Sequence, residues 1–242
     1  HSALRYLNNT RTKIWTAEDP VEITQKGLRQ VQVKPKIGLD FVAAMRSFLR
    51  ADPDVIMVGE MRDKETTAIG IQASLTGHLV LSTLHTNSAP ESISRLLDMG
   101  MDPFNFSDAI LCILAQRLAR TLCKNCRQSY HPSIEEYTSL AREYGTNDFK
   151  DSGNIPFKDD IVLNKPVGCN GCNGSGYRGR MALHELLMGT DEIKTQIQNK
   201  AKIDAIRTQA ITDGMKTLKQ DGIEKVFNGR LDLLQVRKVC IR

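Results

Sequence analysis

The sequence predicts an α/β protein with a mainly parallel sheet. Two apolar runs of strand length, Val55–Val58 and Leu79–Thr83, lack the alternation of a half-buried strand, as expected when both faces of a parallel strand are covered. Segments with helical periodicity, residues 40–50 and Lys64–Leu75, come before these two runs. Strands that alternate with helices in this way are typical of folds in which crossover helices join parallel strands.

The beginning of the chain adds a helix and a strand. His1–Asn8 resembles the end of a helix, because no capping residue precedes it. Lys13–Ala17 is predicted to be a short strand, which Glu18, Asp19 and Pro20 bring to an end. The helix over residues 40–50 has an apolar stripe formed by Phe41, Ala44, Met45 and Phe48.

Helix starts further along are marked by side chains that can cap them. Asp63 is placed to cap the helix Lys64–Leu75, and Ser88 with Glu91 has the capping-box pattern of a helix that runs to about Met99. Asp102-Pro103 opens another helix, which we expect to continue through the apolar stretch to Arg117.

The character of the sequence changes at Cys123. A polar stretch with one helix near Ser133–Glu143 is followed by a strand over Arg180–Leu187. Three short helices, separated by Gly214 and Gly229, complete the chain.

The bulk properties fit a soluble globular protein. With 242 residues, of which 40% are hydrophobic and 25% charged, the chain can form one core and a smaller subdomain. The longest apolar run, Ala109–Ala115, is far shorter than the roughly 20 residues of a membrane-spanning helix. Residues 1–12 contain no apolar segment of a signal peptide. We therefore expect a cytosolic protein.

The net charge of +5 is modest, and basic residues cluster in one place only: Arg117, Arg120, Lys124 and Arg127. We interpret this cluster as a local surface patch, because aromatic residues that could stack on bases are not interleaved with it. Attraction to an acidic lipid or an acidic partner stays open.

Four cysteines form two CxxC pairs, Cys123 with Cys126 and Cys169 with Cys172. Each pair can present two thiolates on a tight turn, and together they complete a tetrahedral shell for Zn²⁺. Disulfides are the alternative, but a cytosolic setting disfavours them. Four protein ligands leave no open position for a substrate, so we expect a structural zinc site. The other two cysteines, Cys112 and Cys240, lie in apolar stretches and are expected in the core.

Acids, histidines and a hydroxyl follow the predicted parallel strands, where ligands bind in open α/β sheets. Glu18 and Asp19 end the first strand, Glu60 follows the second, and Thr83 and His85 end the third, which His78 precedes. An apolar strand ending in an acid is the Walker B pattern, in which the carboxylate lies near Mg²⁺ and phosphate. The alternative is that Glu60 caps the next helix and that the histidines are hydrogen-bonded structural residues.

The phosphate-binding sequence G-x-x-x-x-G-K-[ST] occurs nowhere in the chain. Either the protein is not an NTPase, or the chain has been trimmed. The uncapped helix at residue 1 favours trimming, because in P-loop proteins a helix follows directly after that lysine and hydroxyl.

Longer motifs narrow the function. Thr16–Glu22 resembles the aspartate box of the secretion ATPase superfamily, Leu49–Asp63 its Walker B segment and Thr76–Asn87 its histidine box. The tetracysteine module, followed by Gly176–Arg180, is similar to that of type II secretion and type IV pilus assembly ATPases. It is unlike the retraction ATPases, which lack those cysteines. The resemblance covers nearly the whole chain.

The resemblance implies a RecA-like P-loop core, here without its Walker A loop, in a homo-hexameric ring that uses ATP and Mg²⁺. On matching positions, Glu18 is the candidate general base, Glu60 the Walker B acid, and His78 and His85 sense the γ-phosphate or a neighbouring subunit. Asp19 and Thr83 are expected to contribute to nucleotide binding. Arg46 and Arg50 face the same region and could support a subunit interface.

The implied organisation is a RecA-like core over residues 1–121, a zinc-binding subdomain over 122–180, and a strand with helices over 181–242. Partners would be inner-membrane platform and anchoring proteins of a secretion or pilus machine, with no nucleic acid. The protein would be cytoplasmic and peripheral to the membrane, and this fragment would be inactive alone. The alternative is a zinc-dependent nucleic-acid-binding or protein-docking module without ATPase activity.

Overall fold

The computed structural model describes residues 1–145 and 161–240, which form two compact units. Unit 1 consists of His1–Ile113 and Met188–Gln209, and unit 2 of Leu114–Leu187 and Ala210–Arg242. The predicted domains 1–121, 122–180 and 181–242 stay predictions, and residues 146–160 and 241–242 of the last two lie outside the described residues.

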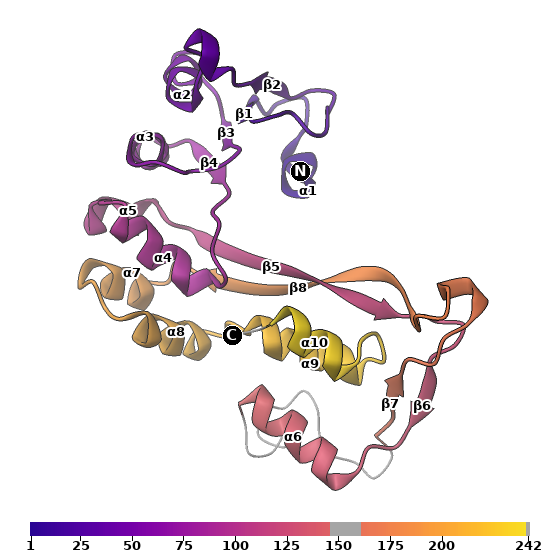
Figure 1. Cartoon of the computed structure of the whole chain (residues 1–242). Helices are drawn as coiled ribbons and strands as arrows, with labels where there is room; N and C mark the ends of the chain where they lie inside the picture. The colour runs from indigo at the N-terminus through magenta and orange to yellow at the C-terminus, as the bar shows by residue number, and fades with distance from the viewer. Residues whose placement is uncertain (146–160, 241–242) are drawn as a thin grey trace. The chain divides into compact units, whose positions relative to one another are not determined.

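Unit 1 contains a parallel sheet of four strands in the order β2-β1-β3-β4 (Figure 1). The α/β class and the parallel sheet predicted from the sequence are therefore confirmed. The three strands predicted for this sheet, Lys13–Ala17, Val55–Val58 and Leu79–Thr83, agree with β1, β3 and β4 to within a residue at either end, whereas β2 was not predicted. The strands are β1 (Ile14–Glu18), β2 (Arg29–Gln32), β3 (Val55–Val58) and β4 (Leu79–Ser82).

Both faces of β3 are covered, as its uninterrupted apolar run predicts. Ile56 and Val58 belong to a core formed with α2 (Phe41–Phe48) and α3 (Lys64–Leu75). Val55 belongs instead to a second core, formed with α1 (Ser2–Leu7). Successive side chains of a strand point to opposite faces, so one short run serves two cores.

The predicted caps open the helices of unit 1. The carboxylate of Asp63 accepts a hydrogen bond from the backbone N–H of Thr66 at 2.8 Å, which satisfies one free donor at the start of α3. The Ser88 hydroxyl accepts a hydrogen bond from the backbone N–H of Glu91 at 3.4 Å and so caps the start of α4 (Ala89–Asp98). The Glu91 carboxylate accepts from the N–H of Asn87, one residue before the position that a capping box requires.

The helix expected from Asp102 to Arg117 is wrong in its second half. α5 (Pro103–Ala109) ends early, and Cys112–Leu122 is the strand β5, which pairs with β8 (Tyr177–Met188). Leucine, alanine, glutamine and arginine favour a helix locally, but pairing with a distant strand satisfies the backbone of β5 and overrides that preference.

The end of the chain holds four helices in the described residues, where three were predicted. The extra break follows Asn199, where Lys200 adopts a left-handed backbone with φ of 50°. Gly214 and Gly229 separate the later helices as expected. The helices are α7 (Asp191–Gln198), α8 (Ile203–Thr212), α9 (Leu218–Phe227) and α10 (Leu233–Val239).

Unit 2 is built around β5 and β8, a small antiparallel pair and three helices. The pair is β6 (Gln128–Tyr130) with β7 (Leu163–Lys165), and the predicted helix near Ser133 is α6 (Ile134–Tyr144). Side chains of α6, β8, α9 and α10 share one apolar core, with Leu140, Leu183, Ile223 and Val236 fully buried.

The two cysteines outside the CxxC pairs differ in exposure. Cys240 is buried, as predicted, whereas Cys112 is exposed, so its assignment to the core was wrong. Cys112 lies on β5, whose side chains alternate between exposed and partly covered, and it falls on the exposed side. None of the helices among residues 1–145 and 161–240 is long and apolar enough to span a bilayer.

Candidate functional site

The carboxyl ends of β1, β3 and β4 meet at one edge of the parallel sheet, because Ala17 pairs with Val58 and Val58 with Ser82. Glu18 is the last residue of β1, Glu60 follows β3 by two residues, and Thr83 comes directly after β4. The strand ends predicted to carry the site are therefore neighbours.

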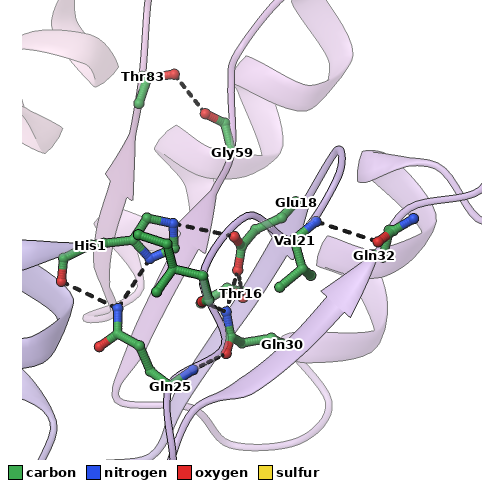
Figure 2. A network of polar contacts seen from close by, with 10 residues as sticks. His1, Thr16, Glu18, Val21, Gln25, Gln30, Gln32, Gly59 and Thr83 are labelled. Carbon is green, nitrogen blue, oxygen red and sulfur yellow. Dashed lines mark hydrogen bonds and ion pairs between the residues drawn. The ribbon is translucent and has the colours of Figure 1, made fainter.

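Glu18 is 3% exposed and is held by two hydrogen bonds to one of its carboxylate oxygens (Figure 2). The Thr16 hydroxyl donates to Oε1 at 2.6 Å, and Gln30 Nε2 donates to the same atom at 2.9 Å. The other oxygen, Oε2, lies 3.6 Å from His1 Nε2. A buried carboxylate with several donors around it has a fixed orientation, which a group that positions a water molecule requires.

Glu60 is also buried, and it contacts two basic groups. Arg62 forms an ion pair with Oε1, and His85 Nε2 lies 3.1 Å from Oε2. The hydrogen bond from Arg62 lowers the pKa of Glu60 against the opposing effect of burial, and His85 adds to the decrease. Glu60 is therefore an anionic oxygen group at neutral pH, of the kind that Mg²⁺ prefers.

Thr83 and Gly59 hold the loops after β3 and β4 together. The Thr83 hydroxyl donates to the Gly59 carbonyl at 2.6 Å (Figure 2). The N–H of Met61 donates to the Thr83 carbonyl at 3.2 Å. A Cβ at Gly59 would lie 3.1 Å from the carbonyl oxygen of Ala17, to which its own N–H donates. This close approach explains a glycine at the position before Glu60.

The remaining predicted site residues are dispersed. Asp19 is exposed, and its charge helps to raise the pKa of Arg62, after the larger effect of Glu60. His78 precedes β4, and its Nδ1 contacts the Ala73 carbonyl at 3.0 Å, so it lies at the amino end of the strand. The structure thus brings Arg62 and His85 to Glu60, and the charge of Asp19 acts on Arg62. His78 instead contacts the backbone of its own chain segment.

The two predicted arginines lie at and beyond the last turn of α2. Arg46 forms an exposed ion pair with Glu65 at 2.9 Å, in the first turn of α3. Arg50 is exposed just past the helix. The roles of Arg46 and Arg50 at a nucleotide or a subunit interface stay predictions.

Sequence reasoning missed Arg62, Thr16 and Gln30 as partners of the two acids. Arg62 and Thr16 are each two residues from the acid that they contact, so spacing could have indicated them. Gln30 reaches Glu18 only because β2 pairs beside β1 with Gln30 opposite Thr16. The register between β1 and β2 cannot be predicted from the residues around either strand alone.

The four cysteines of unit 2 converge as predicted. Cys123 and Cys126 lie between β5 and β6. Between β7 and β8, Cys169 precedes a short 3₁₀ turn and Cys172 is its last residue. All four Sγ atoms lie within 4.8 Å of one another, with separations of 4.0 Å for Cys123–Cys169 and 3.8 Å for Cys126–Cys172. None of these thiols is in a disulfide.

Backbone N–H groups point at these sulfurs. Cys172 Sγ accepts from the N–H of Cys169 at 3.3 Å and of Gly176 at 3.2 Å; despite burial, these bonds lower its pKa to about 6. Burial instead raises the pKa of Cys126 to about 11, although the N–H of Gly168 donates to its sulfur. A Cβ at Gly168 would lie 2.5 Å from a backbone oxygen, so only glycine fits there.

This donor set fits a tetrahedral thiolate site. Zinc–sulfur bonds of about 2.3 Å place neighbouring sulfurs about 3.8 Å apart, close to the observed separations. A bound cation would also remove the penalty that burial imposes on the thiolates. The geometry shows that the cluster could hold a metal ion.

Comparison with known proteins gives consistent results. Residues 1–238 match the family model described as "Type II/IV secretion system protein". The chain is 46% identical over 237 residues to the type IV pilus assembly ATPase PilB of Myxococcus xanthus, covering 98% of this chain and 40% of that protein. It is 45% identical over 229 residues to the type II secretion system protein E of Dickeya dadantii, covering 95% and 43%. The chain thus spans less than half the length of these relatives.

Solved structures agree in fold. The pilus retraction motor PilT with bound ADP superposes with a TM-score of 0.67 at 25% identity, over 98% of this chain and 55% of that chain. The DotB ATPase of Legionella pneumophila superposes with a TM-score of 0.64 at 21% identity, over 99% and 55%. The parallel sheet with its strand-end acids, the tetracysteine cluster and nearly full-length sequence similarity lead to one assignment: the chain belongs to the family of type II/IV secretion system proteins.

Proposed function

We propose that this chain is part of a motor ATPase that couples ATP hydrolysis to the assembly of a pilus or pseudopilus. The observation that carries the proposal is the pair of buried carboxylates, Glu18 and Glu60, at the carboxyl ends of adjacent parallel strands. Its sequence relatives are named as secretion and pilus assembly proteins, and both structural neighbours are named as motors or ATPases.

In this proposal the two acids divide the work. Glu18, oriented by Thr16 and Gln30, would accept the proton of the attacking water. Glu60 would hold Mg²⁺ directly or through water, and the cation would neutralise charge on the phosphates. Thr83 and His85 adjoin Glu60 and would contact the terminal phosphate or report its presence.

Other parts of the proposal concern the protein in its machine. The chain would act in a homo-hexamer in the cytoplasm, attached to the inner membrane through platform and anchoring proteins. Residues 1–121 would be the RecA-like core, 122–180 a subdomain in which the four cysteines hold structural Zn²⁺, and 181–242 a helical region. His78, Asp19, Arg46 and Arg50 would serve nucleotide sensing or subunit contacts.

The proposal is tested in the full-length protein that contains this chain. Replacing Glu18→Gln keeps the size of the side chain and its place between the two donors but removes the base. The rate of ATP hydrolysis should fall by about 10²–10⁴ with little change in ATP binding. Glu135→Gln removes an exposed acid on α6 and should leave the rate unchanged. An unaltered rate in Glu18→Gln would refute its role as the base.

The chain by itself lacks the sequence G-x-x-x-x-G-K-[ST]. Without its lysine and backbone amides, phosphate binding loses its main donors. We therefore expect very weak ATP binding and no turnover by the isolated chain. Calorimetric titration with ATP and Mg²⁺ measures this, and micromolar affinity that Glu60→Gln abolishes, and that therefore belongs to the site of the two acids, would contradict it.

A further inference from the structure

A cavity of about 340 Å³ lies in unit 2, beside the first cysteine pair. Its lining includes four cationic side chains, Lys124, Arg127, Arg178 and Arg230, together with Thr121 and Asn125. Two of the cations belong to the basic cluster that the sequence shows, and two come from distant segments. The fold therefore concentrates positive charge that the sequence disperses.

Within residues 1–145 and 161–240, no acid lines this cavity. Among the described residues, the side chains of Lys124, Arg178 and Arg230 have no carboxylate within ion-pair distance. Nearby Arg120, in contrast, has an interaction partner: its guanidinium carbon stacks over the Tyr177 ring, 5.1 Å from the ring centre. Four like charges around one concavity repel one another unless an anion or solvent compensates them.

Hydrogen bonds join the chain segments that form the walls of the cavity. The N–H of Leu122 donates to the carbonyl of Arg230 at 3.0 Å, and the Thr121 hydroxyl donates to the carbonyl of Arg178 at 2.6 Å. Arg127 Nη1 donates to the carbonyl of Gly229 at 2.5 Å. This bond uses one of the five N–H groups of the guanidinium, and the others can donate to a ligand. Three chain segments are thus fixed around the cations.

We propose that this cavity binds a compact phosphorylated ligand, through a phosphate monoester or diphosphate group. Guanidinium groups present parallel N–H donors that match phosphate oxygens. Four cations are balanced by a group carrying two or three negative charges better than by one carboxylate. The site is separate from the acids proposed for ATP hydrolysis, so it does not depend on that function.

The lining argues against a nucleic acid as the ligand. None of the described residues that line it has an aromatic side chain on which a base could stack. The volume of this concavity, about 340 Å³, also suits one compact group better than an extended backbone. A soluble phosphorylated compound and a phosphorylated lipid head group share the required chemistry, and the experiment separates them.

Calorimetric titration of the purified chain with pyrophosphate tests the proposal. The pocket variant is Arg178→Gln with Arg230→Gln. The control is Arg142→Gln with Lys238→Gln, which removes the same charge from exposed positions of unit 2 outside the cavity. We expect saturable binding that is at least about tenfold weaker in the pocket variant, since two charge-assisted hydrogen-bonding groups are lost. The control should stay within about twofold of the parent, a change that general electrostatics can cause.

Circular dichroism and thermal melting establish that both variants fold. Flotation with vesicles containing phosphatidic acid provides the second arm: binding that the pocket variant loses would assign the phosphate to a lipid. Binding of pyrophosphate alone would assign it to a soluble compound. The proposal is overturned if the parent binds neither, or if the pocket variant binds like the control. It is also overturned if mixed-sequence DNA binds more tightly than pyrophosphate and the pocket variant abolishes that binding.

Discussion

Replacing Cys126→Ser removes one of the four sulfurs of the proposed metal site and is expected to destabilise unit 2. A metal bound by all four sulfurs cross-links the two turns and closes a chain segment of about 50 residues, from Cys123 to Cys172. Three sulfur ligands hold the metal more weakly, so the cross-link is lost under mild chelation.

The expected loss follows from the length of that segment. In the chain-entropy description, closing a loop of this size restricts the unfolded chain by about 4 kcal/mol. Unit 2 has about 107 residues, whose unfolding entropy near the melting temperature is about 0.22 kcal/mol/K. The melting temperature of unit 2 should therefore fall by about 15–20 °C.

Two measurements check this prediction. Elemental analysis of the parent should give about one zinc per chain, and the variant should have much less after dialysis against a chelator. Scanning calorimetry should then show the lower transition. Cys112→Ser removes an exposed thiol outside the cluster and should change neither quantity. A metal-free variant that melts like the parent would refute a structural metal.

Further predictions concern single side chains. The exposed thiol of Cys112 should be alkylated at least about tenfold faster than Cys240, whose pKa burial raises to about 11, as peptide mass spectrometry can measure. Burial and a neighbouring carboxylate raise the pKa of Tyr144 to about 12, so its neutral form stabilises the fold below about pH 10. That contribution should disappear between about pH 10 and 12, which difference titration against Tyr144→Phe detects; ionisation at the ordinary pKa would contradict it. Ile56→Ala, at a fully buried position of β3, should cost about 2–5 kcal/mol in urea unfolding, whereas Ile37→Ala, 74% exposed, should cost less than about 0.5.

Local signals in the sequence determined much of unit 1. Capping residues such as Asp63 predict where helices begin, because the bond that they make spans only three residues. The apolar run of β3 predicts a strand because both of its faces are buried. The same expectation was wrong in part for β4, which lies at the edge of the sheet and has only partly buried apolar side chains. The spacing within each CxxC pair is also a local signal, because one tight turn presents both sulfurs. A four-sulfur metal site requires two such turns, so the two pairs predict that the cysteines converge.

Only the tertiary structure decided what depends on distant partners. β5 is a strand because β8 pairs with it, although its residues favour a helix, and Cys112 occupies an exposed position of that strand. Gln30 contacts Glu18 through the register of β2, and Arg178 and Arg230 join Lys124 around one cavity through hydrogen bonds between segments that are remote in the sequence. These contacts arise from long-range pairing and packing, whose free energy is absent from any short window of sequence.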